Sequence, residues 1–469
     1  MQHQREGLLL PEATQTPDDL HVYEAFKAAH LDTTEVYRQM SLEGEQKQRA
    51  LVALRAGEDA DFSVPESPDE VPLDSRIAVL KDWKRELIAD PSIDPDIKQA
   101  YRWKVNEDIA NLYMLQASRE GNMSAFRRWN KYIYGEPDEM IYRGALDWVA
   151  ADAEQIIASS DKSFAIESAQ KVLALLEGQR GYRELLAPDE ETFAAVREDH
   201  LREGGYYALL LDGVTLPHDG KITNEVGDAA LRHVLRNNLQ SDYEIVDAPG
   251  AAWSVVHSRS EVERPKTYNM PAKRFVGLGV GHEIGRHLLE RVNGLRGPVR
   301  LAAGGLDRTE KGNEGRAIVS EIVPYESFDE FGKLVRWRDI LRRDIAIGYA
   351  WGIGQDEPRT SKETYAFMNA IDTMYQAKLT GQDASETQDK AHKKTGDLLA
   401  RVLRGVDGAK GGAYLKDKVY LEGHVATWLT AAQKGAQSIS EGDLGKFDIN
   451  NPRHIALLQN KGLLPKEPL

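Results

Sequence analysis

The sequence predicts a predominantly α-helical α+β protein with a small β-sheet just before a glycine-rich helix. Apolar residues recur at helical spacing along most of the chain; in the segment 75–88, for example, Ile77, Leu80, Trp83 and Leu87 are spaced to share one helix face. Short β-prone runs gather instead between residues 242 and 271. The helical pattern then resumes at 275–292. These observations favour helices packed around a minor sheet.

Three regions follow in order along the chain. Residues 1–74 predict an N-terminal arm that ends in an acidic, proline-containing segment, 57–74, whose composition is typical of a solvated linker or a disordered segment. For residues 75–240 we expect a helical part. Residues 241–469 predict a core that holds the sheet and the C-terminal helices.

Each region has its expected elements. In the second we expect helices near 75–88, 97–115, 123–133, 137–159, 161–178 and 223–238. The third opens with DYEIVDAPGAAWSVVHS, two β-prone runs around a Pro-Gly turn, and with 264–271, an edge strand or a loop. Helices are then expected near 275–292, 313–323, 327–348, 362–378, 386–404 and 415–432.

Composition excludes several classes of protein. The formal net charge of −15 argues against bulk binding to nucleic acid or to an anionic membrane, although a local basic groove is compatible with it. The absence of cysteine excludes disulfides, thiolate metal sites and thiol nucleophiles, so any metal must be held by His, Asp or Glu. No secretory or membrane-spanning apolar run is found, which predicts a cytoplasmic protein.

The stretch GLGVGHEIGRHLLE, residues 277–290, contains two competing patterns. Its glycines suggest a phosphate-binding loop, but a dinucleotide fingerprint would need a third glycine at His282, and a P-loop would need G-K-[ST]. We therefore expect the glycines to allow close approach of backbone or substrate.

The second half of that stretch suggests a metal site with unusual spacing. In H-E-x-x-H, the two histidines share one helix face, whereas His282 and His287 are five residues apart and would diverge by about 140° on a regular helix. One residue accommodated as a π-type bulge would bring them together, and Gly285 tolerates such distortion. The alternative is two unrelated histidines. The metal hypothesis therefore requires a distorted helix between His282 and His287.

A third ligand must come from elsewhere in the chain. The best candidate is Glu314, on an apolar helix that ends at Pro324. Glu321, seven residues on, shares its face and is a candidate hydrogen-bond partner for a ligating histidine, as is Asp417. Each of these carboxylates could equally form a surface salt bridge. Among the other histidines, His257 and His424 are the only ones we single out.

Four motifs in order carry a family resemblance: HEIGRHLLERVNG, NEGRA, RVLRG and GGAYLKDKVYLEG. Together they resemble a bacterial family of unclear role known for HEIGTH and QEGLA motifs, and the related microtubule-associated tyrosine carboxypeptidases. NMSAFRRWNKYIYGEPDE and LGKFDINNPRHIALLQNKGLLP extend the likeness, which covers about residues 75–469.

The resemblance implies a zincin-like metallopeptidase that uses Zn²⁺. By motif position, His282, His287 and Glu314 match the metal ligands and Glu283 matches the catalytic glutamate. The expected activity is that of a carboxypeptidase acting on a peptide or protein C-terminus, in which a zinc-bound water attacks with Glu283 as general base. Tyr420 is the candidate oxyanion stabiliser. Arg404 and Lys416 are candidates for holding the substrate carboxylate, or are helix-end charges.

Two arginines depart from the family pattern. Arg286 and Arg316 stand where the motifs carry threonine and leucine, and they either face the substrate or are ordinary solvent-facing charges. The acidic tubulin tail is not expected as a substrate of a chain this acidic. Two other functions remain open: a regulatory or binding protein with a structural metal, and a zinc hydrolase of a non-peptide amide.

Overall fold

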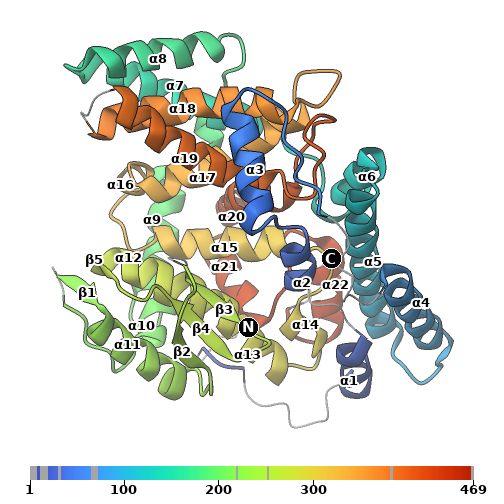
Figure 1. The fold of residues 1–469 in the computed structure, drawn as a ribbon. Coiled ribbons are helices and arrows are strands. Elements are labelled where there is room, and N and C mark those ends of the chain that lie inside the picture. Colours follow the sequence, from blue (N-terminus) through green and yellow to red (C-terminus); the bar gives the residue numbers. More distant parts are fainter. Residues whose placement is uncertain are drawn as a thin grey trace.

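The computed structural model describes residues 8–10, 19–29, 33–64, 72–217, 220–250, 253–380 and 384–465. Helices dominate this part of the chain, as predicted (Figure 1). Its first half contains α1 (Leu20–Ala29), α2 (Thr33–Gln39), α3 (Gly44–Arg55), α4 (Leu73–Ala89), α5 (Pro95–Arg119), α6 (Met123–Tyr134), α7 (Glu139–Ser159), α8 (Ser163–Leu175), η1 (Arg183–Leu186), α9 (Glu190–Leu201), α10 (Tyr206–Leu210), α11 (Asn224–His233) and the π-helical turn η2 (Val234–Asn238).

The second half holds the elements that build the candidate site. It contains α12 (Ala272–Arg274), the π-helix η3 (Phe275–Leu288), α13 (Leu289–Arg296), α14 (Leu301–Gly304), α15 (Glu310–Ile322), α16 (Phe328–Gly332), α17 (Val335–Trp351), α18 (Ser361–Thr380), α19 (Ala384–Val402), η4 (Leu415–Lys418), α20 (Val419–Lys434), α21 (Gln437–Glu441), η5 (Gly442–Leu444) and α22 (Pro452–Asn460). No helix in the described residues is both long and apolar enough to cross a bilayer.

Local signals explain most helix boundaries. Asp94 caps α5, where its carboxylate accepts the backbone N–H groups of Asp96 and Ile97 at 2.9 and 3.1 Å and Pro95 occupies the first turn. Asp189 caps α9 in the same way, although its APDE segment suggested only a break between helices. The single helix expected at 327–348 is wrong: the structure has α16 and α17 there, separated by an extended residue at Leu334.

Two small sheets occur in the described residues. One pairs β1 (Lys221–Thr223) with β5 (Asn269–Pro271), so the segment at 264–271 supplies a strand. The other has the order β2 (Glu244–Asp247), β4 (Glu261–Arg264), β3 (Ser254–Val256). The two predicted β-prone runs are therefore strands, but they are separated by β4, which is parallel to β2 and antiparallel to β3.

The arrangement in space places η3 and α15 at the centre. In Figure 1, α7, α8, α18 and α19 form an upper layer, α15 crosses the middle, and the strands lie below with α10 to α13. α15 packs closely on α20, where a Cβ at Gly315 would meet the Gly423 carbonyl oxygen at 2.2 Å. This close crossing brings the helix that carries Glu314 near the start of α20.

The described parts of the N-terminal arm pack on the rest of the molecule. The Asp19 carboxylate accepts the backbone N–H groups of Arg300 and Leu301, where α14 begins, at 2.7 and 3.0 Å.

The first half of the predicted linker, residues 57–64, is packed too. Phe62 is fully buried and exchanges backbone hydrogen bonds with Gly405 and Val406. The buried Phe62 side chain thus anchors this first half of the predicted linker, whose acidic and proline-containing composition predicted a solvated segment. Residues 65–71 lie outside the described part. The division into three regions stays a prediction.

Candidate metal centre

The helix that carries the HEIGRH motif is distorted, as its spacing requires. η3 is a π-helix from Phe275 to Leu288, and it continues directly into α13. A π-helix has a longer repeat than an α-helix, so residues five apart return to one face. The imidazoles of His282 and His287 accordingly lie together, with their Nε2 atoms 3.3 Å apart.

Close contacts around η3 explain its glycines. A Cβ at Gly281 would meet the Tyr207 hydroxyl at 2.0 Å, and one at Gly285 would meet the Tyr206 hydroxyl at 2.1 Å. The Tyr206 hydroxyl donates to the Gly281 carbonyl at 2.9 Å. At these two positions the close approach is made by tyrosines of α10 and not by a substrate.

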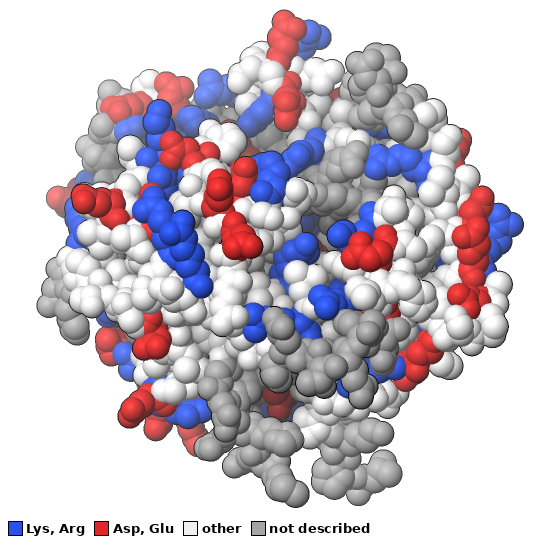
Figure 2. Space-filling model, turned by 90° about the horizontal axis from the view of Figure 1, so that it is seen from below, with Lys and Arg blue, Asp and Glu red and all other residues white. Residues whose placement is uncertain are grey.

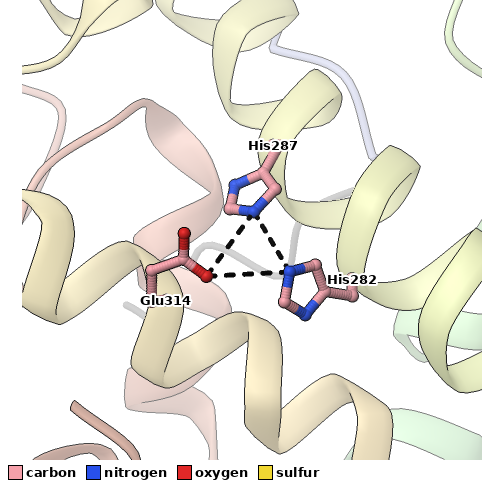
Figure 3. A group of neighbouring side chains, drawn as sticks. All are labelled: His282, His287 and Glu314. Carbon is pink, nitrogen blue, oxygen red and sulfur yellow. Dashed lines mark hydrogen bonds and ion pairs between the residues drawn. The ribbon is translucent and has the colours of Figure 1, made fainter. Parts of the chain in front are cut away.

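His282, His287 and Glu314 form a group that could hold a metal ion (Figure 3). The Glu314 Oε2 atom lies 3.7 Å from the Nε2 atom of His282 and 3.9 Å from that of His287. Tetrahedral zinc with bonds near 2.0–2.1 Å holds its ligand atoms about 3.4 Å apart. Two imidazoles and one carboxylate at these separations therefore fit a zinc ion and leave a fourth position for a non-protein ligand.

A second layer of contacts orients the first histidine. The Glu321 carboxylate pairs with Nδ1 of His282 at 2.7 Å, so Nε2 is the ring nitrogen turned toward His287 and Glu314. Arg336 in turn pairs with both Glu321 oxygens, at 2.6 and 2.8 Å. Glu321 is thus confirmed as the histidine's partner. Arg336 was not found from the sequence, because nothing in the R-W-R-D segment distinguishes it from a surface cation.

Burial and neighbouring charges set the pKa values at this centre. Burial alone would lower the pKa of His282, but the hydrogen bond and charge of Glu321 outweigh it and raise the pKa to about 9. Burial and the charge of His282 lower the pKa of His287 well below its usual range. Burial alone would raise the pKa of Glu321, but the charge of Arg336 and the contact with His282 lower it to about 2.

Glu283 lies beside the three candidate ligands. Its side chain is buried, and Oε1 is 3.8 Å from Nε2 of His282. Burial, together with the charges of Glu314 and Glu321, raises the pKa of Glu283 to about 7. The carboxylate is near enough to contact a molecule at the fourth position.

Tyr420 and Lys416 approach the centre from the segment η4–α20. Burial and the charge of Glu314 raise the pKa of Tyr420 to about 12, so its hydroxyl stays protonated at neutral pH. This hydroxyl has no hydrogen-bond partner among the described residues. Lys416 Nζ pairs with Oε2 of Glu310 at 3.2 Å, one helical turn before Glu314.

Arg404 lies just beyond α19 and contacts Tyr37, as Lys416 does at a longer distance. Its guanidinium stacks on the Tyr37 ring at 3.7 Å, and Lys416 Nζ lies 5.8 Å from the same ring. The Arg404 Nε and Nη1 atoms are buried and have no hydrogen-bond partner among the described residues.

The solvent-facing alternative for Arg286 and Arg316 is wrong, because both side chains are fully buried. Arg286 pairs with Asp443, donates to Ser320 Oγ at 2.8 Å and stacks on Tyr206. Its remaining contact is with Nε2 of His200, at 3.0 Å.

Arg316 has a similar setting on α15. It pairs with Glu290 at 2.8 Å and contacts the Phe447 carbonyl at 3.4 Å. The two arginines therefore connect the helices of the metal centre to the C-terminal segment 442–447. Their partners lie far away in the sequence, so the motifs alone did not reveal these contacts.

Three other sequence candidates have different environments. Asp417 accepts from Nε and Nη2 of Arg401 and contacts neither candidate histidine ligand, so its predicted role is wrong. His424 is a core residue whose ring nitrogens contact the Leu186 carbonyl and the Trp428 indole. His257 binds the Lys446 ammonium through Nε2 at 2.7 Å.

Comparison of the chain with protein-family models, with curated proteins and with solved structures finds no match. Any function must therefore be argued from the site itself.

Proposed function

We propose that this chain is a zinc-dependent metallopeptidase, specifically a carboxypeptidase, of the kind suggested by its resemblance to the HEIGTH/QEGLA family. The observation that carries the proposal is the π-helix, which turns a misspaced motif into a two-histidine site completed by Glu314. A helix without such a site has no evident reason to adopt a π-helical repeat over fourteen residues.

The residues around the centre have distinct roles in this proposal. When bound, zinc supplies Lewis-acid polarisation of a carbonyl and of water. Glu283 accepts a proton from the attacking water and delivers it to the leaving amine. Tyr420 donates a hydrogen bond to the oxyanion that develops on the carbonyl. Glu321 keeps His282 in the tautomer that presents Nε2.

Exopeptidase action is supported by the cations beyond the centre. Arg404 has buried N–H groups that find no acceptor in the described part of the chain, and arginine pairs well with carboxylates. Lys416, which pairs with Glu310 of α15, adds a second positive charge near Tyr37. A free peptide C-terminus suits these two cations. On the face shown in Figure 2, Lys and Arg side chains, with Asp and Glu side chains among them, border a central hollow.

Glu283 distinguishes this proposal from a structural metal site. Structural zinc sites in proteins are closed by four protein ligands and have no need of a base beside the ion. Three donors with an adjacent, buried glutamate favour hydrolysis. A non-peptide amide substrate would use the same centre, and the assay below separates it from a peptide.

The test combines metal analysis with a peptide-library assay on the purified chain and on Glu283→Gln. We expect about one zinc per chain in both proteins, and products shortened by one C-terminal residue in the wild type only. Loss of the general base should lower the cleavage rate about 10²- to 10⁴-fold.

Glu225→Gln is the matched control, because Glu225 is an exposed glutamate in the first turn of α11. It should cleave as the wild type does. Protein without zinc would refute the metal site, equal cleavage by Glu283→Gln would refute the assigned base, and internal cuts would refute the carboxypeptidase.

A further inference from the structure

Arg404 presents buried hydrogen-bond donors that lack an acceptor. Both Nε and Nη1 are without a partner in the described residues, and no ion pair neutralises the guanidinium there. A buried donor left unpaired is costly, so such groups in native proteins call for an explanation. A ligand acceptor would remove the cost, and an anionic one would also balance the charge.

The face of the same guanidinium is covered by Tyr37. The distance from Cζ of Arg404 to the ring centroid is 3.7 Å. With one face occupied by the ring, acceptors in line with the N–H bonds approach from the edges of the guanidinium. Stacking on an aromatic ring also restricts a long, flexible side chain to one orientation.

Tyr37 belongs to the N-terminal arm, which the sequence did not connect with the site. It lies on α2, which packs on α5. Met40, three residues on, is fully buried, and Ser41 Oγ donates to the Tyr37 carbonyl at 2.9 Å. The ring is therefore held in place by a packed segment.

The ring is also near the second candidate substrate cation. Lys416 Nζ is 5.8 Å from its centroid and bonds Glu310, which precedes the ligand Glu314 by one turn of α15. A continuous series of contacts thus leads from Arg404 through Tyr37 and Lys416 to the metal-binding helix.

We propose that Tyr37 is a positioning residue of the substrate site, which holds Arg404 so that its free N–H groups receive the terminal carboxylate of a peptide bound at the metal centre. This inference rests on the proposed function, because it assigns the peptide's terminal carboxylate to that same site. It makes the N-terminal arm a part of the specificity for free C-termini.

The experiment measures binding and needs no turnover. Zinc-loaded Glu283→Gln protein is immobilised and equilibrated with a library of N-acetylated pentapeptides randomised at the last two positions, supplied in free-acid and C-terminally amidated forms. The enrichment of free acid over amide is read by mass spectrometry. In this background we expect about tenfold or greater enrichment of the free acids, the size of a charged hydrogen bond.

Adding Tyr37→Ala should weaken free-acid binding roughly 3- to 30-fold, the range of a cation–π contact, and leave amide binding unchanged. Tyr37→Leu, which keeps much of the apolar volume, should behave like the alanine variant. Tyr37→Phe should retain the enrichment, because it keeps the ring. Tyr132→Ala is the matched control, since Tyr132 also receives an arginine, Arg308 at 5.4 Å, but is 40% exposed.

Three results would overturn the inference: unchanged enrichment in both Tyr37→Ala and Tyr37→Leu, equal weakening of acid and amide, or no enrichment in the Glu283→Gln background. Zinc content, measured on every variant, reports on the metal centre separately. A failure of the proposed peptidase would appear differently, as zinc-bound wild-type protein that binds free acids and cleaves none of them.

Discussion

Two groups of buried polar side chains share the π-helix, and they differ in how their charges are balanced. In the arginine cluster, Arg286 pairs with Asp443 and Arg316 pairs with Glu290. In the candidate metal centre, the two histidines and Glu314 form a group that could hold a metal ion, and Oε1 of Glu283 lies 3.8 Å from Nε2 of His282. Each arginine of the first group has a carboxylate partner in the protein, whereas the second group could also take an added cation. The comparison therefore contrasts buried ion pairs with buried groups whose arrangement suits a ligand.

The largest expected effect comes from breaking the arginine cluster. Arg286→Met breaks the buried ion pair with Asp443, and removal of one member of a buried ion pair costs about 3–5 kcal/mol. Urea denaturation should show a loss of this size. The double variant Arg286→Met/Asp443→Leu removes both charges and should recover most of the stability. A single variant within about 1 kcal/mol of the wild type would contradict the assigned role.

The metal centre was largely predictable from the sequence, and the arginine cluster was not. The five-residue spacing predicted the π-type distortion because only that geometry brings His282 and His287 together. Helical periodicity also placed Glu321 on the face of Glu314. These inferences were local, since each depended on residues within about two helical turns.

The rest depended on contacts between distant segments. Arg286 and Asp443 are 157 residues apart, and arginine is rarely buried unless paired, so a surface position was the reasonable expectation. Strand β4 was missed because its sequence, EVER, buries only Val262. Tyr37 lay in a weakly patterned arm, and its contact with Arg404 depends on how that arm packs.

The second prediction concerns Glu321, which contacts both His282 of the candidate metal centre and Arg336. Glu321→Gln removes the negative acceptor of His282 and also the partner of Arg336. Loss of such an outer contact typically weakens metal affinity about 10- to 100-fold. Competition with a zinc chelator measures the change, which should be absent in Glu326→Gln, a neighbouring exposed glutamate. Unchanged affinity would place Glu321 with the structural ion pairs instead.

The smallest expected effect is the change in melting temperature of the metal-free protein when Glu314 is replaced. It contrasts Glu314 with the paired charges of the arginine cluster. Burial raises the pKa of Glu314, which means that its charged form is disfavoured in the fold. A carboxyl group with a raised folded-state pKa destabilises the protein progressively as the pH rises above its unfolded value of about 4.3. At pH 7 in the presence of a chelator, Glu314→Gln should therefore melt at the wild-type temperature or slightly above it.

The same variant should lose the zinc-dependent rise in melting temperature that the wild type shows, because binding to the folded state alone is stabilising. A substitution that spares the metal-free fold and abolishes the response to zinc is the behaviour of a ligand. If Glu314→Gln instead destabilised the metal-free protein as strongly as Arg286→Met, its carboxylate would belong with the balanced, structural charges. The distinction between structural ion pairs and candidate metal ligands would then not hold for Glu314.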